Sequence, residues 1–193
     1  MNHPDSMLKN FIHVERGIIP AELCDEFVQK IENKDWKPHE WYNPDIESVV
    51  FDINKELDCW NPSYEEEEPL MQYVMHAGTV YTQKYAYPIE QTNTILHGIG
   101  RLRFNRYAPG QIMRQHQDHI YSMFDGKQRG IPILSFVLNL NDDYEGAEIF
   151  FWDDYVVPLG KGDILVFPSL FLYPHGVREA TKGKRYSAVC WGF

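Results

Sequence analysis

The chain has 193 residues, of which 44% are hydrophobic and 15% aromatic, and its formal net charge is −10. This length and composition suit one globular domain, spanning residues 1–193, that buries a core without metal or disulfide staples. The acidic charge argues against nucleic acid as a partner, because binding phosphate backbones needs basic surfaces.

The cysteines and the hydropathy pattern bear on the compartment. Cys24, Cys59 and Cys190 cannot all pair and none lies in a C-x-x-C motif, which favours a reducing compartment. The first residues contain no apolar signal segment, and no run of about 18 apolar residues could span a membrane. We therefore expect a cytoplasmic protein with no membrane partner.

Two amphipathic helices are predicted in the first half of the chain. Residues 18–33 place Pro20 where a first helical turn tolerates it and repeat apolar residues at helical spacing. Residues 63–88 begin with Ser63, a potential N-cap, and four glutamates that suit the positive end of a helix. Their acidic run is interpreted as a solvated helix start rather than a binding site. The apolar stripe of this helix consists of Leu70, Val74, Ala77, Tyr81 and Tyr85.

Short strands are predicted from about residue 98 onward. The turn signals APGQ, NDDYEG, PLGKGD and TKGK separate them, and no helical segment lies between them. This pattern indicates a mainly β, α+β protein whose core is a jelly roll, with a helical N-terminal region of residues 1–97 packing on a β core of residues 98–193. The predicted strands are residues 101–107, 133–140, 147–152, 163–168 and 184–193.

The segment RQHQDHIY, residues 114–121, contains two histidines and one aspartate. On a helix His116 and His119 would share a face, whereas on a strand His116 and Asp118 would do so. The preceding Pro-Gly turn and the lack of a helix cap favour the strand. An isolated H-x-D motif is nevertheless expected by chance in a chain of this composition.

Two later residues give the H-x-D motif its context. His175 follows a predicted strand, and Arg185 lies ten residues beyond it on the next one. Two neutral imidazoles and one carboxylate on a β scaffold are the facial ligand set of non-haem Fe(II). The ordered set is therefore a stronger signal than the H-x-D motif alone.

The second half of the chain resembles the prolyl 4-hydroxylase-like branch of the Fe(II)- and 2-oxoglutarate-dependent dioxygenases, which have a double-stranded β-helix core of the jelly-roll and cupin type. The family order of a Tyr strand, H-x-D, a strand ending in Leu-Asn, a G-G-E turn, a distal His and a later basic residue is found here. Ala147 replaces the second glycine of the turn, and residues 36–96 match no family pattern. The matching segments are RYAPGQIMRQHQD, SFVLNLND, EGAEIFF, VPLGKGDILVFPS, YPHGV and GKRYSAVCW.

The resemblance implies a role for several residues. His116, Asp118 and His175 would bind Fe(II), and Arg185 would bind the distal carboxylate of 2-oxoglutarate in bidentate fashion. Tyr107 would donate a hydrogen bond to the same carboxylate, with a packed strand aromatic as the alternative. Strand parity with Arg185 further predicts that Ser187, Val189 and Trp191 line the same cavity.

His119 has the opposite parity and is predicted at the rim of the cavity rather than on the metal. The remaining histidines have no usable spacing, and we assign them no role. They are His3, His13, His39, His76 and His97.

The resemblance also implies a reaction. Fe(II), 2-oxoglutarate and molecular oxygen would hydroxylate a C–H bond with release of succinate and carbon dioxide, and ascorbate is a candidate reductant. Retention of Asp118 favours hydroxylation over halogenation. Nucleic-acid demethylases of the superfamily usually carry a second arginine where this chain has Trp191, so a peptidyl residue, proline first, or a free amino acid is the expected substrate.

Two other interpretations compete with this one. A cupin-like binding or isomerase module would use the metal without 2-oxoglutarate, and a purely structural jelly roll would use neither. Residues 120–130 and 37–63 are the expected substrate loops, but they contain no pattern that identifies the substrate. The sequence does not indicate the oligomeric state.

Overall fold

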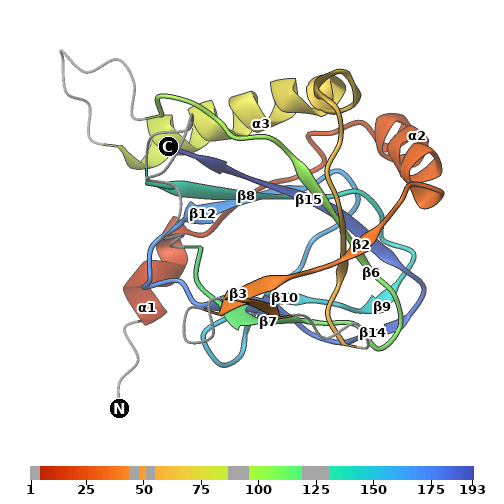
Figure 1. Cartoon of the computed structure of the whole chain (residues 1–193). Coiled ribbons are helices and arrows are strands. Elements are labelled where there is room, and N and C mark those ends of the chain that lie inside the picture. The colour runs from red at the N-terminus through yellow and green to blue at the C-terminus, as the bar shows by residue number, and fades with distance from the viewer. Residues whose placement is uncertain (1–4, 44–47, 51–54, 87–95, 119–130) are drawn as a thin grey trace.

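The computed structural model describes residues 5–43, 48–50, 55–86, 96–118 and 131–193. Two β-sheets lie one above the other, and the two long helices cover the outer face of the larger sheet (Figure 1). This arrangement confirms the predicted jelly-roll core with helices outside it. No helix in the described ranges combines the length and apolarity needed to cross a bilayer.

The two predicted helices are present with slightly shorter bounds. Helix α2 (Ala21–Glu32) begins after Pro20, and helix α3 (Tyr64–Tyr85) begins after Ser63. A short helix α1 (Asp5–Leu8) and a 3-10 turn η1 (Lys9–Phe11) precede them and were not predicted. The stripe of α3 faces the sheet as expected, because its first four members are buried.

One member of the acidic run departs from the prediction of a solvated helix start. The Glu67 side chain is buried, accepts a hydrogen bond from the Leu102 amide at 2.8 Å and pairs with Arg101. It lies on the inner side of α3 and fixes the start of the first core strand. Glu67 is therefore a structural carboxylate, and the helical period rather than composition decides its position.

The larger sheet has the order β1-β12-β8-β15-β6-β5-β2. All of its pairings are antiparallel, so neighbouring strands run in opposite directions along its length. Its strands are β1 (His13–Glu15), β2 (Lys37–Pro38), β5 (Asp58–Trp60), β6 (Arg103–Tyr107), β8 (Leu134–Asn139), β12 (Ile164–Pro168) and β15 (Arg185–Gly192).

The smaller facing sheet has the order β11-β10-β13-β7. Two further pairs, β14 with β9 and β3 with β4, lie beside it. These strands are β3 (Trp41–Asn43), β4 (Ser48–Val50), β7 (Met113–His116), β9 (Glu145–Gly146), β10 (Ile149–Phe151), β11 (Tyr155–Val157), β13 (His175–Val177) and β14 (Ala180–Lys182).

The predicted split into a helical region, residues 1–97, and a β core, residues 98–193, needs a correction. Strand β1 pairs with β12, and β5 pairs with β6, so the first half of the chain supplies strands to the larger sheet. These strands have only three residues each, too few for a period-2 pattern to be recognised in the sequence.

Alternation along β8 explains how one strand serves two cores. Phe136 and Leu138 pack with the helices, whereas Val137 packs between the two sheets. All six residues of the strand are buried because the sheet is covered on both faces. The same alternation points Ser135 and Asn139 away from the helices, toward the space between the sheets.

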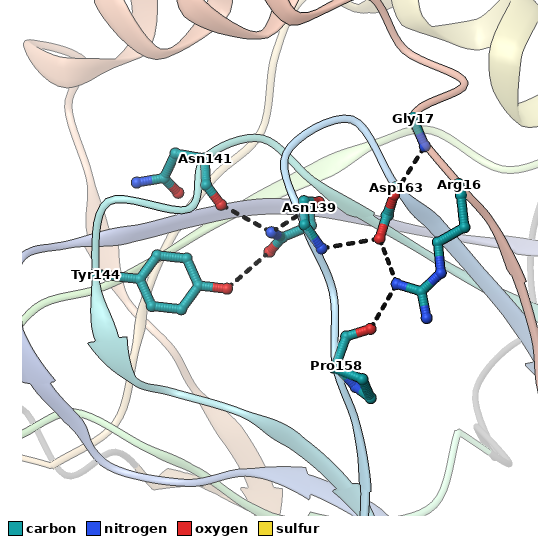
Figure 2. Close-up of polar contacts among 8 residues, drawn as sticks. Arg16, Gly17, Asn139, Asn141, Tyr144, Pro158 and Asp163 are labelled. Carbon is teal, nitrogen blue, oxygen red and sulfur yellow. Dashed lines mark hydrogen bonds and ion pairs between the residues drawn. The ribbon is translucent and has the colours of Figure 1, made fainter.

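A buried carboxylate fastens the N-terminal segment to the β core. Asp163, which precedes β12, accepts hydrogen bonds from the Gly17 amide at 2.8 Å and from Arg16 at 2.6 Å (Figure 2). The Asn139 amide donates to the Asp163 backbone carbonyl at 2.9 Å, which continues the contact to the end of β8. This network connects the start of the chain to the strand that lines the site.

Candidate metal centre

The two histidines and the aspartate of the predicted triad meet at one point between the sheets. His116 ends β7 and lies directly opposite His175, which begins β13. Asp118 follows β7, and its two oxygens lie 3.5 and 3.6 Å from Nε2 of His116 and of His175. One ligand atom from each residue lies within 4.8 Å of the others, which is close enough to coordinate a single ion.

The imidazoles are oriented by the backbone. Nδ1 of His116 lies 2.8 Å from the Arg114 carbonyl, and Nδ1 of His175 lies 3.0 Å from the Tyr173 carbonyl. A carbonyl can only accept, so each Nδ1 donates its proton to the backbone and each Nε2 faces the other ligands. This is the tautomer that binds a metal.

The protonation states also suit a cation. Burial lowers the pKa of His175, so its imidazole is neutral at pH 7. Burial opposes ionisation of Asp118, but the neighbouring His175 and His116 and the hydroxyl of Ser135 outweigh it and hold the pKa of Asp118 below its usual range. Ser135 Oγ donates to Asp118 Oδ2 at 2.5 Å. A neutral imidazole at His175 and an ionised carboxylate at Asp118 therefore face each other beside His116, as a divalent metal requires.

A cavity opens from these ligands toward the larger sheet. It is narrow, with a volume of about 40 Å³. All eight residues that the sequence places in the site line it: His116, Asp118, His175, Arg185, Tyr107, Ser187, Val189 and Trp191.

Arg185 is a fully buried cation in the wall of this cavity, with 1% of its surface exposed. Its Nε donates to Asn139 Oδ1 at 2.9 Å, and its Nη1 donates to the Ala147 carbonyl at 3.2 Å. Its Nη2 has no hydrogen-bond partner in the described ranges of the chain. A buried guanidinium that has a free N–H, and no carboxylate beside it in the part of the chain that the structure describes, fits an anionic ligand.

Asn139 holds Arg185 in this position. Its Nδ2 donates to the carbonyls of Asn141 at 2.8 Å and Gly160 at 3.2 Å, and Tyr144 donates to its Oδ1 (Figure 2). The side-chain oxygen is thereby aimed at the arginine. In the sequence the Leu-Asn strand end was identified only as a family pattern. The role of Asn139 is indicated by its position at the end of an apolar strand, where its side-chain amide is fully buried and needs hydrogen-bond partners.

Tyr107 and Trp191 line the cavity from β6 and β15. The Tyr107 ring lies 5.4 Å from the Arg185 guanidinium carbon, and burial raises the pKa of Tyr107 to about 12. Its hydroxyl therefore stays protonated and can donate a hydrogen bond. The Trp191 ring lies 5.7 Å from the guanidinium carbon of Arg103, a cavity residue that sequence reasoning missed.

The predicted rim residue His119 lies outside the described residues, as do residues 120–130 of one predicted substrate loop. His39, for which no role was predicted, is buried near the cavity. Burial, with Arg103, His116 and Arg114 nearby, lowers its pKa to about 3.

A facial pair of histidines and a carboxylate inside a jelly roll, opposite a buried arginine, defines the class of non-haem iron oxygenases. Residues 102–193 match the family model of the 2OG-Fe(II) oxygenase superfamily. Residues 102–193 thus correspond to a 2OG-Fe(II) oxygenase domain, and the expected pair of Fe(II) and 2-oxoglutarate agrees with this family.

Curated relatives support the same family. A PKHD-type hydroxylase of Idiomarina loihiensis is 36% identical over 98 residues, 48% of this chain and 42% of that protein. A PKHD-type hydroxylase of Caulobacter vibrioides is 32% identical over 123 residues, 60% of this chain and 53% of that protein. The matched region spans about half the length of these relatives.

Solved structures share the fold across nearly the whole chain. A prolyl 4-hydroxylase of Pseudomonas putida aligns with a TM-score of 0.65 at 18% identity, covering 94% of this chain and 91% of that one. A Trichoplax adhaerens prolyl hydroxylase in complex with a hypoxia inducible factor peptide aligns with a TM-score of 0.68 at 16% identity, covering 95% and 84%.

Proposed function

We propose that this protein is an Fe(II)- and 2-oxoglutarate-dependent dioxygenase that hydroxylates a peptidyl residue, with proline as the first candidate, or a free amino acid. In this reaction 2-oxoglutarate, molecular oxygen and a substrate C–H bond give succinate, carbon dioxide and a C–OH group. The observation that carries the proposal is that buried Arg185 has an N–H with no partner among the described residues. It lies in the cavity whose far wall holds His116, Asp118 and His175.

Each component of the site has a task in this reaction. The three ligands would hold Fe(II) from one side and leave the opposite side open, and the bound iron and keto acid supply the oxidising chemistry. Arg185 would bind the distal carboxylate of the keto acid, with Tyr107 donating a hydrogen bond beside it. Phe151 and Phe167 flank His175 at ring-centre distances of 5.6 and 4.8 Å and keep water from that side of the ligands.

A peptide substrate is supported by the relatives. The Trichoplax prolyl hydroxylase was solved with a peptide fragment, and the curated relatives are named hydroxylases. A free amino acid remains the second substrate class of this proposal.

One spectroscopic experiment separates an oxygenase from a cupin-like module that binds metal alone. Anaerobic addition of Fe(II) and 2-oxoglutarate should produce a weak visible charge-transfer band, and admission of air should yield succinate. Uptake of Fe(II) with no band and no succinate would assign the fold to a metal-binding or isomerase module instead. Arg185→Lys, which keeps the charge but not the bidentate geometry, should weaken the band at a fixed 2-oxoglutarate concentration.

The substrate itself is identified by mass. A panel of prolyl and other peptides and of free amino acids, incubated with Fe(II), 2-oxoglutarate and air, should contain members that gain one oxygen. Asp118→Ala should remove this gain because one metal ligand is lost. A gain that survives in Asp118→Ala would contradict the assigned ligand set.

A further inference from the structure

Arg103 is a second arginine in the wall of the metal-site cavity. It begins β6 and shares strand parity with Asn105 and Tyr107, which also line the cavity. It lies opposite Val189 on β15, whereas Tyr107 lies opposite Arg185. Four residues along a strand correspond to about 13 Å, so the two arginines stand at opposite ends of the cavity.

The guanidinium of Arg103 has no acidic partner among the described residues, unlike the arginines just before β6 and further along it. Arg101 pairs with Glu67 and Arg106 pairs with Asp58, but no ion pair in the described ranges involves Arg103. Its Nε is buried without a hydrogen-bond partner in the same ranges, and its charge faces the ring of Trp191. A buried unpaired donor costs about 1–3 kcal/mol, so this N–H suits an acceptor supplied by a ligand.

Arg103 also faces a second, larger cavity that lies beside the metal site. This cavity has a volume of about 470 Å³, enough for a small molecule. Arg103 lies in the walls of both cavities, so a group bound to it lies next to the metal site. The other lining residues of the second cavity are Asp35, Lys37, Pro38, His39, Glu40, Cys59, Trp60 and Asn61.

Among the residues that line the second cavity, Arg103 is the half-buried group that carries a positive charge at pH 7. Lys37 is exposed and pairs with Asp35 at 2.6 Å. His39 is neutral at pH 7 because burial lowers its pKa to about 3, and burial raises the pKa of the Cys59 thiol to about 11. The remaining charge is Glu40, which is exposed to solvent and would repel an anion only from the rim.

We propose that Arg103 binds a carboxylate of the substrate, which enters from the second cavity while Arg185 holds the co-substrate. This inference rests on the proposed function and narrows its substrate class. The substrate therefore carries a carboxylate close to the carbon that is hydroxylated. This group is either the α-carboxylate of a free amino acid or the side chain of an acidic residue in a peptide. A neutral prolyl segment leaves Arg103 without its acceptor.

The test uses the anaerobic protein loaded with Fe(II) and 2-oxoglutarate, and pairs of probes that differ in one carboxylate. N-acetyl amino acids are compared with their amides, and blocked tripeptides with a central Asp or Glu are compared with those bearing Asn or Gln. Calorimetry measures the dissociation constant of each probe and, separately, of 2-oxoglutarate. A charge-assisted hydrogen bond predicts that at least one carboxylate binds about 10-fold or more tightly than its amide.

Variants assign this preference to Arg103. Arg103→Gln should reduce it below about 2-fold and leave the dissociation constant of 2-oxoglutarate within about 3-fold of the wild type. Arg103→Lys should restore some of it, and Arg178→Gln, which removes an exposed arginine outside both cavities, should not change it. Preference in the N-acetyl set indicates a free amino acid, and preference in the tripeptides indicates an acidic residue.

Three results would overturn the inference. They are a wild type that binds no carboxylate better than its amide, a preference that persists in Arg103→Gln, and a loss of 2-oxoglutarate affinity in Arg103→Gln as large as that in Arg185→Lys. The last result would place Arg103 in the co-substrate site. Absence of the charge-transfer band in the wild type is a separate outcome, which refutes the proposed function itself.

Discussion

The guanidinium carbon of Arg185 lies 5.4 Å from the centre of the Tyr107 ring, and the two residues are register partners on β15 and β6. The ring supports the cation on one side, while Asn139 accepts from its Nε on another. The orientation of the arginine is therefore fixed before any ligand binds. Such preorganisation reduces the entropy that ligand binding must lose.

Arg185→Lys should raise the dissociation constant of 2-oxoglutarate about 10- to 100-fold, because a charge-assisted bidentate contact is replaced by a single point charge. Calorimetry under anaerobic conditions measures this constant. The affinity for Fe(II) alone should stay near the wild-type value. An unchanged 2-oxoglutarate constant would move the carboxylate site to another residue, and Arg178→Lys serves as the exposed control.

Ser135→Ala should weaken metal binding about 10- to 100-fold, because the hydroxyl that orients Asp118 is lost. Titration of the anaerobic protein with Fe(II) measures the effect, and circular dichroism checks the fold. Ser169→Ala is the matched control, since Ser169 contacts Ser135 at 2.7 Å and has no bond to Asp118. Equal losses in the two variants would show that general packing, not orientation of Asp118, is responsible.

The sequence predicted the long elements and the cluster of candidate metal ligands because both leave local or ordered signals. The helical stripe of α3 spans several turns, and His116, Asp118, His175 and Arg185 follow one another in a known order. Short strands such as β1 and β5 were missed, because three residues that pair with distant strands have no period of their own.

Positions that depend on tertiary contacts were missed for a related reason. Asn139, Ser135 and Arg103 are ordinary strand residues in the sequence, and their roles arise from neighbours brought close by the fold. Glu67 was misassigned because its three acidic neighbours suggested solvent, although its helical position faces the sheet. Composition describes a segment, whereas burial depends on one face of it.

The free energy of unfolding of the metal-free protein should fall as the pH is lowered from 7.5 to 5, and His39 accounts for part of this fall. Burial lowers the pKa of His39 to about 3 in the folded state, against about 6.5 in an unfolded chain. The unfolded state therefore binds more protons in this window, and the stability that is fully present above pH 6.5 is lost as the pH falls toward 3. At pH 5 the contribution of His39 to this loss is about 2 kcal/mol.

Urea denaturation of His39→Gln at the two pH values tests this assignment. The variant should lose about 2 kcal/mol less than the wild type between pH 7.5 and 5. His76→Gln removes an exposed histidine of α3 and should reproduce the wild-type loss. If the free energy of unfolding falls by the same amount in His39→Gln and in the wild type, His39 does not cause the pH dependence.

Ser63→Ala should destabilise the protein by about 1 kcal/mol, because it removes half of the capping box of α3. Ser63 Oγ accepts from the Glu66 amide at 3.4 Å, and Glu66 accepts in turn from the Ser63 amide at 2.7 Å. Ser63→Asp keeps a capping acceptor and should retain most of the stability. Urea denaturation at pH 7 compares the three proteins, and an equal loss in Ser63→Ala and Ser63→Asp would refute the capping role.

Glu66 adds a pH dependence to the same cap. A hydrogen bond from Lys34, then one from the Ser63 amide, lowers the pKa of Glu66 to about 2. The stability that its carboxylate contributes is therefore present above about pH 4.5 and is lost as the pH falls toward 2. Glu66→Gln, which can still accept the bond from the Ser63 amide, should flatten this acid limb in urea denaturation between pH 5 and 3. If the limb keeps its slope in Glu66→Gln, other carboxylates account for it.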